Sequence, residues 1–128
     1  MTDTSTPRGE LALQTIAMPA DTNPSGDIFG GWVVSQMDLA GAIAAAKIAR
    51  SRVVTVAIDS MVFHIPVKVG AVVTCYTDII KVGRSSIRLN VEVWQYQKMT
   101  FISEKVTSGE FVFVATDKDG NPQPISQD

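Results

Sequence analysis

One stretch of this sequence restricts the possible folds more than any other. Residues 31–50 have the pattern of a single long helix that is apolar almost all the way round. Such a helix is about 30 Å long, and a helix that is apolar on every side is normally buried. We therefore expect other segments of the fold to cover it on most sides. Ser35, Gln36 and Asp38 interrupt the apolar residues, so the stretch does not predict a membrane span.

The remainder of the chain is β-rich, and its connections are short. Candidate strands cover residues 10–18, 53–63, 71–82, 86–96 and 104–116. The segment 86–96 is the clearest of them, because every second residue along one face is apolar: Ile87, Leu89, Val91 and Val93. Connections of hairpin length make the strands after the helix antiparallel. We expect an α+β fold in which one antiparallel sheet wraps around the long helix, and its unpaired edge strands favour pairing between two copies.

Size and composition fit a single globular domain. The 128 residues are 45% hydrophobic and 19% charged, which is typical of a folded domain. We expect residues 1–128 to form one domain with flexible tails at 1–8 and 121–128. The net charge of -2 and the lack of a basic stripe argue against a nucleic acid as the main partner. The polar N-terminus predicts no signal peptide, which favours a cytoplasmic protein.

The loop ahead of the helix contains residues that could carry out chemistry. A turn signal at 23–26 is followed by Asp27 and then by Gly30 and Gly31 at the expected helix start. The first N–H groups of a helix have no partner within it and lie at the positive end of its dipole. A carboxylate that activates water, beside N–H groups that stabilise an oxyanion, would serve acyl chemistry. Asp27 could equally be a helix-capping or turn aspartate, and Asn23 could hold the attacking water or only form the turn.

A second candidate site is the segment 81–86, which contains two cations, a glycine and two hydroxyls near the end of a strand. The residues concerned are Lys81, Gly83, Arg84, Ser85 and Ser86. Such hydrogen-bond donors suit the phosphate groups of a ligand. A solvated hairpin turn has the same composition, so that alternative stays open.

The remaining polar and nucleophilic residues have structural interpretations. Asp38 lies inside the apolar helix, where a carboxylate needs a partner; we interpret it as a hydrogen-bonded structural residue rather than a second site carboxylate. Ser60 either lines the site or faces the core. His64 and Cys75 are the only histidine and cysteine, and no third residue completes a nucleophilic triad with them. We expect Cys75 to be a core thiol, and we predict no metal site because no metal-ligand spacing is present.

Five motifs, in the same order and at compatible spacing, are similar to those of a known family. They are GDIFGGW at 26–32, SQMD at 35–38, VVTV at 53–56, SM at 60–61 and KVGRSSI at 81–87. Together they resemble the hotdog-fold acyl-CoA thioesterases, and most closely the short bacterial YciA-like acyl-CoA hydrolases. The resemblance covers residues 10–117.

This resemblance implies a hotdog fold, a dimer as the building block and often a trimer of dimers, which is a hexamer. It implies hydrolysis of acyl-CoA to free acid and coenzyme A at subunit interfaces, with no cofactor, since coenzyme A is part of the substrate and product. The family's catalytic carboxylate falls on Asp27, its oxyanion donors fall on Gly30 and Gly31, and its CoA-contacting segment falls on 81–86.

Two positions depart from the family pattern. Val62 stands where the family often has Asn, and Ile65 stands where it often has Lys before a proline. Both changes affect the expected acyl-chain preference and ligand contacts more than the reaction.

We therefore expect a homo-oligomeric acyl-CoA thioesterase in which Asp27 activates water, while Ser60 and the segment 81–86 contact the substrate. The alternative is a non-catalytic acyl-CoA or fatty-acyl binding module, which would not need the whole motif from Asp27 to Gly31. A structural oligomer without a ligand would not need the cluster at 81–86. A dehydratase of similar fold typically pairs Asp with His, and no His lies beside Asp27 in the sequence.

Overall fold

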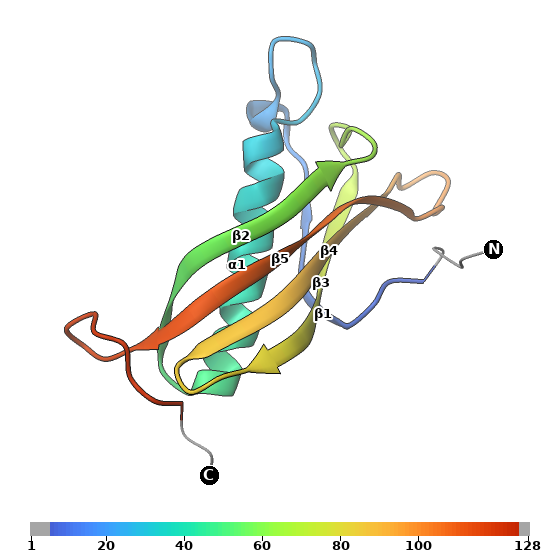
Figure 1. Ribbon diagram of the computed structural model, residues 1–128. Helices are drawn as coiled ribbons and strands as arrows, with labels where there is room; N and C mark the ends of the chain where they lie inside the picture. The colour runs from blue at the N-terminus through green and yellow to red at the C-terminus, as the bar shows by residue number, and fades with distance from the viewer. Residues whose placement is uncertain (1–5, 126–128) are drawn as a thin grey trace.

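The computed structural model describes residues 6–125 and consists of one long helix packed across one curved antiparallel sheet (Figure 1). The strand order across the five-stranded sheet is β1-β3-β4-β5-β2. This arrangement confirms the predicted α+β architecture, with a sheet wrapped around one helix. In chain order the elements are β1 (Glu10–Ile16), the 3₁₀ turn η1 (Pro19–Asp21), α1 (Gly30–Ala49), β2 (Arg52–Phe63), β3 (Val72–Val82), β4 (Ser86–Tyr96) and β5 (Glu104–Thr116).

The predicted limits of the helix and the strands agree with the structure closely. β4 and β5 have the predicted bounds, and α1 begins and ends one residue earlier than expected. The helix ends at Ala49 because Arg50 adopts a left-handed conformation, with φ of 53°, and donates its N–H to the Ala46 carbonyl (2.7 Å). This is a common way for a helix to end, and here it leads the chain directly into β2.

The core lies between one face of the sheet and one face of α1. The alternating apolar residues of β4 are fully buried, as predicted: Ile87, Leu89, Val91 and Val93. They face the buried side of α1, which consists of Val33, Met37, Ala40, Gly41, Ala45 and Ala49. Small residues in the middle of this helix face allow close packing, since a Cβ added at Gly41 would lie 2.8 Å from the ring of Phe113.

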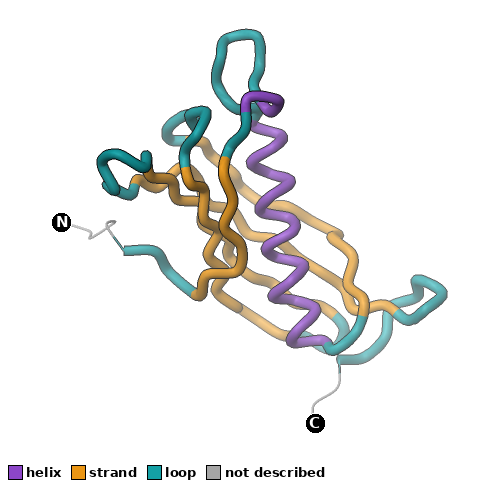
Figure 2. Tube along the Cα trace, turned by 180° about the vertical axis from the view of Figure 1, so that it is seen from behind, coloured by secondary structure: helices purple, strands orange, loops and turns teal. Residues whose placement is uncertain are grey.

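Only one face of α1 is covered, so the prediction that the helix is buried on most sides is wrong for the single chain. Leu39, Ile43 and Ile48 are 53%, 41% and 40% exposed. Figure 2 shows α1 open along the side that faces away from the sheet. β2 forms an edge of the sheet and also has exposed apolar side chains, including those of Val56 and Ile58. The apolar pattern therefore includes a surface that one chain leaves uncovered.

Parts of the two predicted tails contact the rest of the fold, and their flexibility stays a prediction. In the C-terminal segment 121–125, the N–H of Ile125 donates to the carbonyl of Arg84 (2.7 Å), and the Ile125 side chain is buried. Near the N-terminus, Arg8 forms an ion pair with Asp78 on β3 (3.1 Å). The first contact joins the C-terminal segment to the loop between β3 and β4, and the second joins the N-terminal segment to β3.

Residues 1–5 and 126–128 complete the predicted tails and lie outside the described residues. Within residues 6–125, no helix is both long enough and apolar enough to cross a membrane.

Replacing Gly41 with alanine should lower the free energy of unfolding. The added methyl group would meet the buried Phe113 ring at 2.8 Å. Overpacking typically costs about 1–3 kcal/mol, which exceeds the roughly 1 kcal/mol that Ala gains over Gly in a helix. Urea unfolding followed by circular dichroism measures the change, and the double variant Gly41→Ala/Phe113→Leu should recover part of it. An unchanged or raised stability in Gly41→Ala would show that close helix packing is not required.

Candidate active site

A pocket of about 310 Å³ opens at the N-terminal end of α1. One side is formed by the loop that precedes the helix, and the other by the chain at the end of β2. Asn23, Asp27 and Gly30 line the first side, and Phe63 and Pro66 are among those lining the second. The structure thus brings three of the four predicted catalytic residues together, and the fourth, Gly31, follows Gly30 in the first helical turn.

The turn before the helix is held together by Asn23. Its side-chain Oδ1 accepts the N–H groups of Ser25 (2.9 Å) and Asp27 (3.1 Å), and its own N–H donates to the Asp27 carbonyl (2.7 Å). Gly26 completes the turn with a left-handed φ of 87°. Asn23 therefore forms the turn, while its Nδ2 donates to no protein group among residues 6–125 and stays available to a ligand in the pocket.

The helix begins with two free backbone donors. The first bonds of α1 are from the N–H groups of Trp32 (3.1 Å) and Val33 (3.3 Å) to the Phe29 carbonyl. Within the described part of the chain, the N–H groups of Gly30 and Gly31 have no acceptor, and no side chain caps the helix. The side chain of Asp27 therefore makes no capping hydrogen bond to α1, and the N–H groups of Gly30 and Gly31 stay unpaired among the described residues.

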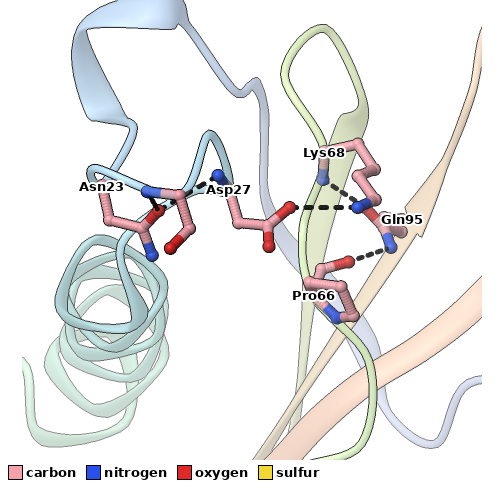
Figure 3. Close-up of polar contacts among 6 residues, drawn as sticks. Asn23, Asp27, Pro66, Lys68 and Gln95 are labelled. Atoms are coloured by element: carbon pink, nitrogen blue, oxygen red, sulfur yellow. Dashed lines mark hydrogen bonds and ion pairs between the residues drawn. The ribbon is translucent and has the colours of Figure 1, made fainter.

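The carboxylate of Asp27 has a cationic partner that the sequence analysis missed. Oδ1 of Asp27 lies 3.0 Å from Nζ of Lys68, and the two side chains are 35% and 57% exposed (Figure 3). Lys68 belongs to the connection between β2 and β3, which the sequence marked only as a turn between Pro66 and Gly70. The one feature of the sequence that could have indicated this partner is a lysine in this turn, two residues after the proline.

The predicted phosphate-binding segment 81–86 lies far from this pocket in the single chain. It forms the hairpin between β3 and β4, where the N–H of Gly83 donates to the Ser86 carbonyl (2.7 Å). Ser86 pairs with Val114 near the end of β5, so the hairpin lies at the C-terminal end of α1 (Figure 1). A helix of this length separates the two ends by roughly 30 Å. One chain therefore does not unite the two predicted halves of the site.

Ser60 does not line the pocket at the helix start. A bulge in β2 between Asp59 and Val62 gives Ser60 a left-handed φ of 46° and turns it away. It lines a separate hollow with Asn90 and Glu110, on the face of the sheet that is turned away from α1. The predicted contact of Ser60 with the Asp27 site is therefore absent within one chain.

Asp38 is half-buried and accepts a hydrogen bond from the Thr55 hydroxyl of β2. This confirms that the carboxylate inside the apolar helix has a hydrogen-bonding partner. It lies beside the free edge strand rather than in the pocket of its own chain.

The histidine and the cysteine do not form a nucleophilic pair. His64 lines the pocket, but Cys75 is fully buried in the core, as predicted. Burial raises the pKa of the Cys75 thiol to about 12, so the thiolate needed for attack is scarce at neutral pH. Among residues 6–125, no three His, Cys, Asp or Glu side chains group together so that they could hold a metal ion.

The sequence from residue 25 to 102 matches the model of the thioesterase superfamily. The chain belongs to this superfamily. The acyl-CoA thioester hydrolase YciA of Salmonella typhimurium is 52% identical over 124 residues, which are 94% of this chain and 93% of the relative.

Two solved structures are similar to this chain in fold as well as in sequence. A hexameric thioesterase from Yersinia pestis is 52% identical, has a TM-score of 0.91, and is matched over 96% of this chain and 100% of its own. A hexameric hotdog fold thioesterase of Campylobacter jejuni is 44% identical, has a TM-score of 0.86, and is matched over 93% and 92%. The predicted hotdog fold and the resemblance to thioesterases are thereby confirmed.

The Cys75 thiol of this protein should resist labelling by thiol reagents while the protein is folded. A pKa near 12 lowers the thiolate fraction at pH 8 by a factor on the order of 10³ relative to an exposed cysteine. Ellman's reagent at pH 8 should therefore label the native protein very slowly and the urea-unfolded protein at once. Equal labelling rates in the two states would show that the thiol is accessible.

Proposed function

We propose that this protein hydrolyses acyl-CoA thioesters to a free acid and coenzyme A. The observation that carries the proposal is the pocket at the start of α1. There Gly30 at the helix start, Asn23 and Asp27 border one space, and Gly31 follows Gly30 in the first helical turn. The 52% identity to a protein named acyl-CoA thioester hydrolase supports the same substrate class.

In the proposed reaction, water attacks the thioester carbonyl while the carbonyl oxygen faces the N–H groups of Gly30 and Gly31. These donors and the positive end of the α1 dipole stabilise the oxyanion of the tetrahedral intermediate. Asp27 takes a proton from the water through Oδ2, which lacks a protein partner among the described residues. The intermediate then breaks its C–S bond, and the coenzyme A thiolate leaves and takes up a proton. Because a thiolate leaves readily, the reaction needs no strong general acid, and we propose no cofactor.

Asp38 is the second candidate for the base. Its carboxylate accepts one hydrogen bond from Thr55 and forms no ion pair within residues 6–125, whereas Asp27 is paired with Lys68. It also lies beside β2, the free edge of the sheet. In a dimer joined along β2, Asp38 would lie near the interface and could serve the pocket of the partner.

The separation of the two predicted half-sites supports an active site shared between copies. The start of α1 and the hairpin 81–86 lie at opposite ends of the sheet (Figure 1). Two copies paired antiparallel along β2 would bring the α1 start of one chain to the same end as the hairpin of the other. We propose that Lys81, Arg84 and the two serines of the hairpin then contact the phosphates of coenzyme A.

The same pairing would cover apolar surface that one chain leaves open, including Leu39 on α1 and Val56 on β2. Burial of such residues from two chains favours association. We propose this dimer as the building block, and a trimer of dimers as the complete assembly, because the two similar solved structures are hexamers.

Thiol release from a panel of short to long acyl-CoAs tests the reaction, with Asp27→Asn and Asp38→Asn measured beside the wild type. If Asp27 is the base, kcat of Asp27→Asn should fall by a factor of about 10²–10⁴, while circular dichroism shows that the variant remains folded. Full activity in Asp27→Asn with loss in Asp38→Asn would assign the base to Asp38. A wild type that releases no thiol, yet melts at higher temperature with coenzyme A, would be a binding module instead.

Mixing two inactive variants tests whether the site is shared. Arg84→Ala and Asp27→Asn each remove one half-site, so each homo-oligomer should have low activity. A mixed dimer contains one site with both halves intact. Co-expression should therefore give each mixed dimer up to about half of the activity of a wild-type dimer. Co-expressing Arg84→Ala with Lys81→Ala, which damage the same half, is the matched control and should restore none. Failure of the first pair to recover would place both halves in one chain.

A further inference from the structure

The buried amide of Gln95 connects the end of β4 to the wall of the pocket. Gln95 is 5% exposed. Its Nε2 donates to the Pro66 carbonyl (2.9 Å), and its Oε1 accepts the N–H of Lys68 (3.3 Å), as Figure 3 shows. Both ends of one side chain therefore bind the backbone of the connection between β2 and β3, which fixes the orientation of the amide and of the bound residues.

The residue held in this way is the one that reaches Asp27. The N–H of Lys68 is bound by Gln95, while its Nζ lies 3.0 Å from Oδ1 of Asp27. The series Gln95–Lys68–Asp27 thus runs from β4, through the connection, to the loop before α1. A backbone bond from the Ile28 N–H to the Val67 carbonyl (3.1 Å) joins the same two segments beside it.

Stability alone gives little reason for this arrangement. An ion pair as exposed as that of Lys68 and Asp27 adds little to folding. Burying the polar amide of Gln95 is unfavourable unless both its ends are bonded. Here both ends are bonded to the backbone of the connection, and the two bonds mainly offset that cost. The arrangement instead controls position, because it fixes Oδ1 of Asp27, a residue that lines the pocket, against Lys68 and leaves Oδ2 without a partner among the described residues.

We propose that Gln95 and Lys68 are positioning residues of this site, an inference that rests on the proposed function. Gln95 sets the backbone of Pro66 and Lys68, and Lys68 holds the carboxylate of Asp27 and with it the turn built on Asn23. This turn also sets the place of Asn23 in the pocket that Gly30 borders. Neither positioning residue needs to touch the reacting atoms, but a displacement of about 1 Å at such a site can cost about 10² in rate.

Hydrogen exchange tests the positioning without requiring any activity. In Gln95→Leu, the Lys68 amide loses its acceptor, so its exchange and that of the Ser25 and Asp27 amides should become at least tenfold faster. Lys68→Met should speed exchange at Ser25 and Asp27 only. Gln14→Leu is the matched control, since Gln14 is a sheet glutamine whose Nε2 donates to Thr74 (2.9 Å) on β3. Unchanged exchange at Ser25 and Asp27 in Gln95→Leu would overturn the proposal.

Steady-state kinetics test what the positioning does. Gln95→Leu and Lys68→Met should each lower kcat by roughly tenfold to a hundredfold, with KM changed less than threefold, and Lys68→Arg should recover most of the loss. Because Gln95 acts through Lys68, the double variant should be no slower than the worse single one, whereas independent losses would multiply. A rise of KM alone in Lys68→Met would make Lys68 a ligand contact and overturn its positioning role.

The two measurements separate this inference from the proposed function. Faster exchange in Gln95→Leu together with no thiol release by the wild type would retain the positioning and reject the thioesterase reaction. An active wild type whose exchange and kcat are both unaffected by Gln95→Leu would reject the positioning and retain the reaction.

Discussion

The close packing of α1 on the sheet is the constraint on which the rest of the structure depends. Gly41 brings the helix against the ring of Phe113, and the alanines beside it keep the approach short over the middle of the helix. Because interiors are packed at crystal-like density, this contact fixes the helix axis relative to β4 and β5. The direction in which the free N–H groups at Gly30 point is then fixed as well, before any ligand arrives.

A fixed helix gives the two ends of the sheet different properties. At one end, the start of α1 provides unpaired donors and a positive dipole. The loop that enters it must bend sharply, which Asn23 and Gly26 make possible. At the other end, the hairpin 81–86 presents cations about one helix length away. In the proposed dimer, an antiparallel second copy paired along the free edge of β2 brings these opposite ends together.

The sequence predicted the local features of this fold well, because they depend on short-range patterns. Alternation in 86–96 gave β4 its bounds and its buried face. The turn at Asn23 followed from the residues that form it. The burial of α1 was misjudged for a related reason: an apolar pattern shows that a face avoids water, and the partner that covers it can belong to another chain. The contacts of the C-terminal segment were not predicted, because Gln123 and Ile125 donate to the distant carbonyls of Ala115 and Arg84, which no local pattern reveals.

The features that the sequence could not supply are those made between distant parts of the chain. Lys68 and Asp27 are 41 residues apart, and Gln95 lies 27 residues beyond Lys68. Their meeting depends on the strand order, which places the end of β4 beside the connection that follows β2. A lysine in a turn and a glutamine at a strand end are each ordinary in a sequence. Only the fold shows that one buried amide, one cation and one carboxylate form a continuous series, and that this series ends in the pocket where the helix begins.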